Sequence, residues 1–263
     1  MRRILIAFVS VFLAISCADE KKENVENEKK DLSFSSKIIE KRLNDCLPEN
    51  GECTFISLTY PVAENGYGGA EKINKEIEDL IVRTIDFQDE GHSEKPEELV
   101  ENFIRDYEET ANEFPEYELP WEATVIGKIN YRSAGLVSIK FNTDMFTGGA
   151  HGYRSTNYLN FDPETGKALK RSDLFNSDFI DYVEKDFRQK KNIPLDSNIN
   201  STGMFFENDE FHLPANIGIT KDEIILHYNA YEIAPYSAGN FVLTYPKTEI
   251  EQYLKIKEET PEI

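Results

Sequence analysis

Hydrophobic spacing divides the N-terminal half of the chain into a predicted strand and two predicted helices. The segment TFISLTY (residues 54–60) alternates, with large apolar residues on one face, which is typical of a strand ending at Pro61. Over residues 73–85, isoleucine recurs every fourth position and predicts an amphipathic helix. A second helix is expected from Pro96, a residue favoured at the first helical position. Its apolar side is predicted to comprise Leu99 or Val100, Phe103, Tyr107, Ala111 and Phe114.

The C-terminal half is predicted to be rich in strands. Short alternating runs are separated by turn signals such as the Pro and Gly of DPETG (residues 162–166). Strands are expected at 124–131, 136–142, 153–161, 167–170, 217–220, 223–228 and 241–245. Helices are expected at 178–189 and, briefly, after Lys247. Meander-ordered strands with helices clustered early predict an α+β fold, a largely antiparallel sheet with packed helices.

The N-terminus has the pattern of an export signal. Arg2 and Arg3 precede an apolar run of 13 residues, 4–16, which is shorter than the roughly 20 residues that span a bilayer. The run closes in AISC, which resembles a lipobox and predicts lipid attachment at Cys17. The alternative is an ordinary signal peptide with a nearby cysteine. A stable lipid anchor needs two or more acyl chains, and we expect it to hold the protein to the membrane.

These patterns predict a domain organisation and a location. A signal peptide (1–16) and a flexible, lipidated tether (17–33) precede the folded part, because residues 18–33 are polar and charged with almost nothing to bury. We expect an N-terminal α/β part with the acidic helix at 34–118 and a β-rich domain at 119–258. The predicted location is the cell envelope, facing the periplasm or the exterior.

Two further cysteines, Cys46 and Cys53, are available for a disulfide in an oxidising compartment. The spacer LPENGE contains turn residues that can bring the two Cα atoms within bonding range. A metal or redox pair is the weaker alternative, because the CxxC spacing and a second pair of ligands are missing.

Negative charge belongs to the folded part of the chain. Residues 1–33 carry six basic and six acidic side chains, so the net charge of −20 lies in the remainder. Residues 86–118 alone hold 13 acidic side chains against Lys95 and Arg105. Such a surface repels nucleic acid and anionic lipid and attracts cationic proteins. The simpler interpretation is a solvated face with no partner.

His151, in the segment TGGAHGY, is the most prominent candidate for chemistry, and glycines flank it on both sides. No HExxH, GxSxG or EF-hand motif accompanies it. Three roles stay open: a structural hydrogen bond, a ligand contact, or catalysis. With no catalytic constellation, metal site or cofactor motif, the sequence favours a protein that is not an enzyme.

The segment YEIAPYSAG (residues 231–239) has the composition of a rigid recognition loop. Pro235 stiffens the chain, and Tyr231 and Tyr236 offer large amphipathic surfaces at low conformational cost. The alternative is that the two tyrosines only hold the loop against the sheet. Candidate ligand-binding residues on the two segments are Gly148, Gly149, His151, Tyr153, Tyr231, Pro235 and Tyr236.

Together, residues 146–175 and 226–246 resemble the extracytoplasmic domain of RsiV-type anti-sigma factors, which sense lysozyme. The same domain type forms the non-catalytic N-terminal region of some peptidoglycan deacetylases and occurs in uncharacterised bacterial lipoproteins. In the anti-sigma factors, loops of this domain plug the glycan cleft of lysozyme, and the YEIAPY segment is similar to one of them.

The resemblance implies a lipid-anchored envelope protein that binds or inhibits a cationic lysozyme. The alternative is a non-catalytic module for peptidoglycan fragments, or a scaffold, and an undetected hydrolase is a third reading. This sequence shows no segment that could serve as the transmembrane helix or cytoplasmic part of such a regulator.

Overall fold

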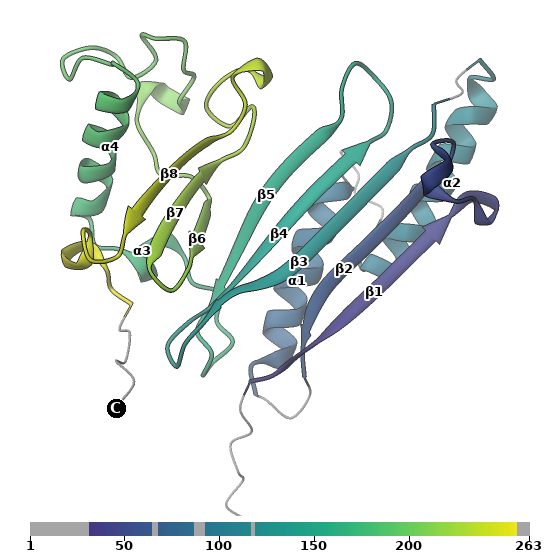
Figure 1. Cartoon of the computed structure of the whole chain (residues 1–263), viewed down its shortest axis with the longest axis horizontal. Coiled ribbons are helices and arrows are strands. Elements are labelled where there is room, and N and C mark those ends of the chain that lie inside the picture. The colour runs from purple at the N-terminus through teal and green to yellow at the C-terminus, as the bar shows by residue number, and fades with distance from the viewer. Residues whose placement is uncertain (1–31, 65–67, 87–92, 117–118, 257–263) are drawn as a thin grey trace, which may run out of the picture.

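The computed structural model describes residues 32–64, 68–86, 93–116 and 119–256 (Figure 1). The expected signal peptide, Cys17 and nearly all of the tether lie outside these residues and stay predictions. No helix in the described part has the length and apolar character needed to cross a membrane.

A five-stranded sheet forms the first half of the fold. Its strands stand in sequence order: β1 (Phe34–Arg42), β2 (Phe55–Ala63), β3 (Glu122–Arg132), β4 (Val137–Phe146) and β5 (Tyr153–Phe161). All neighbours are antiparallel except β2 and β3. Parallel neighbours need a crossover, which α1 (Ala70–Ile85) and α2 (Pro96–Glu113) supply along one face of the sheet (Figure 1). The predicted α+β class with a largely antiparallel sheet is confirmed.

The two predicted helices pack their apolar sides on this sheet. The isoleucine row of α1 is buried throughout and meets Ile56, Leu58 and Tyr60 of β2. In α2, Leu99, Val100 and Phe103 are buried as expected. The prediction for Phe114 was wrong, because the helix ends one residue earlier and leaves the ring 49% exposed.

Two features of the first strands differ from expectation. β1 was not predicted, because its inward positions alternate lysine with isoleucine. Lys37 and Lys41 extend along the sheet and pair with Glu97 and Glu101 of α2. The strand β2 also continues through Pro61 rather than ending there. Proline is tolerated because the pairing with β3 ends at Thr59, so the missing N–H removes no hydrogen bond on that side.

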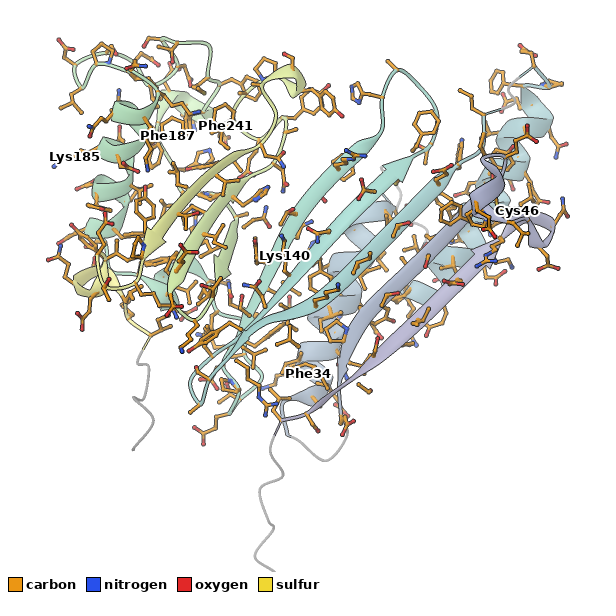
Figure 2. The ribbon with its side chains drawn as sticks, in the orientation of Figure 1. Phe34, Cys46, Lys140, Lys185, Phe187 and Phe241 are labelled. Atoms are coloured by element: carbon orange, nitrogen blue, oxygen red, sulfur yellow. A yellow bond between two sulfur atoms is a disulfide. The ribbon has the colours of Figure 1, made fainter. Side chains whose placement is uncertain are left out.

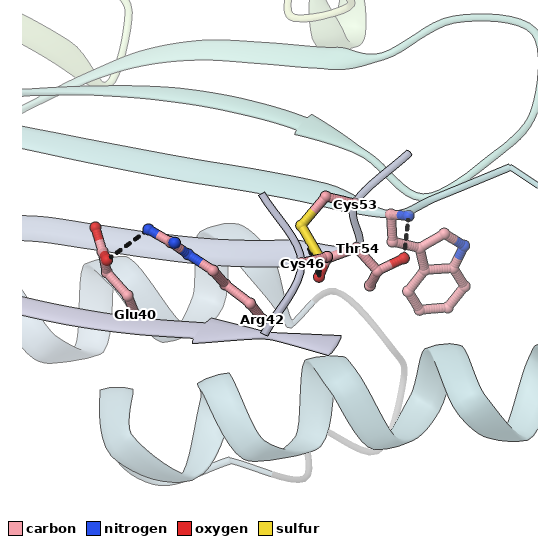
Figure 3. The surroundings of a disulfide bond; sticks show 6 residues. Glu40, Arg42, Cys46, Cys53 and Thr54 are labelled. Atoms are coloured by element: carbon pink, nitrogen blue, oxygen red, sulfur yellow. Dashed lines mark hydrogen bonds and ion pairs between the residues drawn. A yellow bond between two sulfur atoms is a disulfide. The ribbon is translucent and has the colours of Figure 1, made fainter. Parts of the chain in front are cut away.

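The predicted disulfide joins Cys46 and Cys53, with their Cα atoms 5.4 Å apart (Figure 3). Gly51 closes the intervening turn in the left-handed region (φ 75°). The next residue, Thr54, accepts a 3.0 Å hydrogen bond at its Oγ1 from the backbone N–H of Trp121. The disulfide therefore lies next to the contact between Thr54 and Trp121, which immediately precedes the paired starts of β2 and β3.

A three-stranded antiparallel sheet forms the second half, from β6 (Asn216–Ile219), β7 (Glu223–Tyr228) and β8 (Phe241–Pro246). The short helix α3 (Arg171–Leu174) and the predicted α4 (Asp178–Lys190) belong to this half. Figure 2 shows Phe187 and Phe241 between α4 and the sheet, with Lys185 on the outer side of the helix. Two predictions were wrong. Residues 167–170 contribute only one bridge, between Phe161 and Ala168, and the C-terminal helix is a single 3-10 turn, Glu251–Tyr253.

The small sheet stands with the free edge of β6 against the large sheet, on the face away from α1 and α2. Three polar side chains of β3, β4 and β5 bond the backbone of Ile217 or Ile219. They are Asn130, Ser138 and Asn160. Gly218 lies against the ring of Tyr158, where an added Cβ would come within 2.5 Å of Cε1.

A boundary between two domains was expected from the sequence at residue 118. The five-stranded sheet contains strands from both sides of that position, and the residues of the second hydrophobic core come mainly from after β5.

Candidate functional site

The two candidate loops, 147–152 between β4 and β5 and 229–240 between β7 and β8, meet at one end of the molecule. The ring of His151 stacks on that of Tyr236, with centroids 3.9 Å apart and planes 8° from parallel. Tyr231 lies beside both, with its ring centroid 5.4 Å from that of Tyr236. These three side chains form what we call the aromatic cluster.

Hydrogen bonds hold the cluster together. The Tyr231 hydroxyl is 3.3 Å from His151 Nε2, and His151 Nδ1 is 3.1 Å from the carbonyl oxygen of Gly152. That same carbonyl accepts a 3.3 Å bond from the Tyr236 hydroxyl. Both tyrosines therefore fasten their loop to the neighbouring loop 147–152, and Tyr231 stays 56% exposed. A fastened but exposed ring is available to a partner.

Backbone conformation at the cluster is unusual. Gly148 and Gly149 adopt positive φ values of 94° and 89°, which glycine allows at no steric cost. Tyr231 has a φ of 70°, a left-handed conformation that is strained for a bulky residue and costs about 1–3 kcal/mol. Such strain is concentrated at functional sites, where the surrounding structure maintains it.

The base of the second loop is fixed by side-chain amides. Asn229 accepts a bond from the Thr156 N–H (2.8 Å) and donates one to the Thr156 carbonyl (3.0 Å). Glu232 accepts a 3.0 Å bond from the Asn229 N–H, and burial raises the pKa of this carboxyl group. The loop is therefore fastened directly to the edge of β5.

Two hollows flank the cluster, and Tyr153, 42% exposed, lines both. The smaller hollow, of about 330 Å³, also contains Tyr236 and the carboxylates of Glu122 and Asp144. Asp144 is paired with Arg154 at 2.6 Å. Arg154 also lines this hollow, so Glu122 is the acidic side chain there that has no salt-bridge partner among the described residues.

The larger hollow is a groove of about 1050 Å³ that follows the outer edge of β5. Gly148 and His151 line one end, α1 forms one wall, and α3 with β6 forms the other. Its cationic residues are Arg83, Lys170 and Arg171. Sequence reasoning missed this groove, although the adjacent Lys170 and Arg171 in an acidic chain were a visible signal.

The remaining predicted residues have simpler settings. Pro235 is exposed and immediately precedes the 3-10 turn Tyr236–Ala238. His227 in β7 is buried, and its Nε2 has no hydrogen-bond partner among the described residues. Burial, with a smaller effect of Lys140, lowers the pKa of this imidazole.

The geometry offers little for catalysis. Both ring nitrogens of His151 contact backbone or tyrosine, and no carboxylate of the described residues is hydrogen-bonded to the ring. Across the described ranges, no cluster of three or more His, Cys, Asp or Glu side chains is arranged to hold a metal ion.

Two family models match different parts of the chain. Residues 47–154 match the model "Deacetylase PdaC", and residues 172–248 match "Protein of unknown function (DUF3298)". The first covers most of the five-stranded sheet with α1 and α2, and the second covers α4 and the small sheet. The interval between them, 155–171, contains most of β5 and the turn that follows it.

A curated relative and two solved structures each match across both of these parts. The chain is 24% identical over 269 residues to the peptidoglycan-N-acetylmuramic acid deacetylase PdaC of Bacillus subtilis (strain 168), covering 92% of this chain and 49% of the relative. The chain thus spans about half the length of the curated relative it matches. It is related to PdaC, and this relationship associates it with the cell envelope.

The structural matches are DUF3298 family proteins from Pseudomonas aeruginosa PAO1 and Bacteroides fragilis. The first has a TM-score of 0.56 and 19% identity, covering 86% of this chain and 96% of the other. The second has a TM-score of 0.58 and 18% identity, covering 86% of this chain and 95% of the other. At these identities the likeness establishes the fold.

Proposed function

We propose that this chain is a non-catalytic binding protein, anchored to the cell envelope by lipid at Cys17, whose aromatic cluster docks a basic lysozyme. The observation that carries the proposal is the stacked and hydrogen-bonded set of His151, Tyr231 and Tyr236, in which His151 and Tyr231 are exposed and Tyr236 is half-buried. Rigid aromatic side chains at the centre of an interface contribute much of its binding energy.

Charge supports a cationic partner. The protein carries a net charge of −20, and Glu122 and Asp144 lie in the hollow beside Tyr236. Acidic side chains around an apolar anchor accelerate association with a basic protein and disfavour acidic ones. The resemblance to RsiV-type sensors supplies lysozyme as the specific candidate.

The decisive experiment is a binding measurement between the purified folded domain and lysozyme. Tyr236→Ala is expected to weaken binding about tenfold or more, since it removes the ring on which His151 stacks. Phe114→Ala is the matched control, because that ring is exposed at the C-terminal end of α2 and, among the described residues, makes no ring contact with the aromatic cluster. The proposal is refuted if the wild-type domain has no affinity for lysozyme at low salt, or if both variants lose affinity equally.

Charge variants separate steering from docking. Glu122→Lys is expected to slow association and flatten its salt dependence while leaving dissociation nearly unchanged. Glu97 and Glu101 of α2 are poorer choices, because each is already paired with a lysine of β1. Glu108, which is exposed on α2, is the comparison position: Glu108→Lys makes the same change of charge there as Glu122→Lys makes beside Tyr236.

The anchor has its own test. Cys17→Ser is expected to leave unprocessed precursor without labelled fatty acid. Equal acyl labelling of the variant and the wild type would exclude Cys17 as the attachment site.

A second candidate function is binding of peptidoglycan fragments or a scaffold role, favoured by the relationship to a deacetylase whose name specifies peptidoglycan. Parallel pull-downs with immobilised lysozyme and immobilised muropeptides distinguish the two candidates. Retention on muropeptides alone would replace the lysozyme proposal.

A further inference from the structure

The groove beside β5 has a charge opposite to that of the protein as a whole. Among its described lining residues there is no aspartate or glutamate, whereas Arg83, Lys170 and Arg171 all contribute. Arg171 donates a 2.7 Å bond to the Leu213 carbonyl, which fixes its position. Within the described part of the chain, Arg83 and Lys170 have no salt-bridge partner. In a protein of net charge −20, such a lining favours an anion.

The floor of the groove is the open edge of a sheet. β5 is the last strand of the large sheet, and alternate residues direct their N–H and C=O groups outward. The backbone N–H and C=O of Thr156 both form hydrogen bonds with the side-chain amide of Asn229. The Asn160 carbonyl accepts a 2.7 Å hydrogen bond from the Leu169 N–H. Tyr158 lies between them and lines the groove, and the described residues give its outward backbone groups no partner.

Asn229 illustrates the chemistry that this edge accepts. One amide oxygen and one amide N–H satisfy both outward groups of Thr156. At Tyr158, two residues farther along, one residue of an extended peptide can do the same with its own C=O and N–H. Nearby Asn160 is buried in the groove wall, and its Oδ1 also has no partner in the described structure.

We propose that this groove binds a short acidic peptide in an extended conformation, paired with the backbone of Tyr158 and held at its carboxylates by Arg83 and Lys170. The guanidinium of Arg83 on α1 and the amine of Lys170 before α3 belong to opposite walls, and successive side chains of an extended peptide point to opposite faces, so carboxylates on two consecutive residues each face a cation. The site depends on neither lysozyme docking nor glycan binding, and therefore goes beyond both candidate functions.

The probe is the pentapeptide Glu-Glu-Val-Ala-Ala, with a fluorophore on its N-terminal nitrogen and a free C-terminal carboxylate; its two glutamates are consecutive and therefore point to opposite walls. Its neutral counterpart, with both glutamates changed to glutamine and an amidated C-terminus, is expected to bind at least about tenfold more weakly. Methylation of the central valine nitrogen removes the N–H that pairs with Tyr158 and is expected to weaken binding about fivefold.

Protein variants locate the site. Arg83→Gln and Lys170→Gln are each expected to weaken binding about threefold, and together about tenfold. Ala215→Trp places a bulky indole ring at the exposed rim of the groove and is expected to abolish binding. Lys185→Gln is the matched control, since Lys185 lies on the outer side of α4, far from β5 (Figure 2). Tyr236→Ala, which tests the lysozyme proposal, is expected to leave peptide binding unchanged.

Amide hydrogen exchange measured by NMR provides a readout independent of charge. The Tyr158 N–H is expected to exchange rapidly in the free protein and to become protected when the acidic peptide is added, while the Thr156 N–H is protected in both. Three outcomes overturn the proposal: equal affinity for the acidic and neutral peptides, binding that survives Ala215→Trp, or no change at Tyr158. Protection of Tyr158 by an N-acetylated disaccharide but not by the peptide would likewise reassign the groove to a glycan.

Discussion

The two halves of the molecule are stabilised by different kinds of core. Beneath the five-stranded sheet the core is mainly aliphatic; its isoleucines and leucines include Ile56, Leu58, Ile73, Ile77, Ile81 and Ile139. Beneath the three-stranded sheet, eight of the buried residues are aromatic, twice as many as beneath the five-stranded sheet, and we call this the aromatic core; its rings are Phe175, Phe179, Phe187, Phe206, Phe211, Tyr228, Phe241 and Tyr245. The aliphatic core is built by regular helices and strands, whereas part of the aromatic core comes from an irregular segment.

The two halves fill their hydrophobic cores in different ways. Aliphatic side chains fill theirs because they recur at the period of a helix or a strand. Phe206 and Phe211 come from residues 191–215, which contain no helix or strand longer than a 3-10 turn, yet both rings pack against Phe187. Large rings bury enough surface to order a segment that has few backbone hydrogen bonds.

The largest expected effect is the loss of the central ring of the aromatic core. Phe187 is fully buried and lies within ring contact of Phe206, Phe211, Tyr228 and Phe241. We expect Phe187→Ala to lower the free energy of unfolding by about 3–5 kcal/mol, because it removes transfer energy and leaves a cavity. Urea unfolding followed by circular dichroism measures this change.

A probe confined to one half turns this variant into a test of coupling. Trp121 is the single tryptophan of the chain and packs against Phe103 in the aliphatic half. If the halves unfold together, Phe187→Ala lowers the Trp121 fluorescence midpoint as much as the circular dichroism midpoint. Ile77→Ala in α1 is the matched variant in the aliphatic half. A fluorescence midpoint that stays at the wild-type value would mean that the halves unfold separately.

The disulfide stabilises only the aliphatic half directly. It closes a loop with a sequence separation of 7, so loop-closure entropy predicts that the double variant Cys46→Ala, Cys53→Ala loses about 2–3 kcal/mol. Because Thr54 beside the bridge holds the Trp121 backbone, the fluorescence transition should shift at least as far as circular dichroism. An unchanged midpoint in both signals would contradict a stabilising role for the bridge.

The junction between the halves is tested at Gly218. An added Cβ at this position meets the buried ring of Tyr158, and Gly218→Ala is expected to lower stability by about 1–2 kcal/mol. Tyr158→Leu shortens that side chain and should recover part of the loss in the double variant. Simple additivity of the two changes would show that the halves do not rely on this contact.

Much of the fold was predictable because it follows local periodicity. The isoleucine row of α1 and the strands over 153–161 and 223–228 have patterns that only one secondary structure satisfies. β1 escaped prediction because Lys37 and Lys41 occupy its inward positions, and their ion pairs to α2 depend on tertiary structure. The order of strands, with β2 parallel to β3, likewise depends on how the two helices pack.

The candidate site, like the fold, was predictable from the sequence only in part. The two loops of the aromatic cluster were identified by composition, since glycine, proline and tyrosine determine how each loop can bend and what it exposes. That His151 would stack on Tyr236 required the fold, because 85 positions separate them along the printed sequence. The walls of the groove are formed by α1, α3 and β6, which are far apart in the sequence. No local sequence pattern indicates that these segments lie together, so the groove could not be predicted.

The smallest expected effect is a pH dependence located at the junction. His227 in β7 is buried, and among neighbouring charged groups Lys140 of β4, labelled in Figure 2, acts on it from the large sheet. Its pKa is lowered from 6.5 in the folded protein, mainly by burial, so the unfolded chain takes up the proton first as the pH falls. The contribution to stability is therefore complete above pH 6.5 and is lost as the pH falls through the folded-state pKa. Glu232, whose pKa is raised, acts in the opposite direction and is common to all variants compared.

The variant His227→Leu removes this titration without adding a polar group to the junction. We expect its unfolding free energy to decline less steeply than that of the wild type as the pH is lowered below 6.5. Phe114→Ala is the control, since that side chain is exposed and carries no titratable group, and it should keep the wild-type slope. Urea titrations at a series of pH values from neutral downward measure all three proteins. If His227→Leu and the wild type share one slope, proton uptake at this histidine is not coupled to unfolding, and the acid sensitivity of the junction must lie elsewhere.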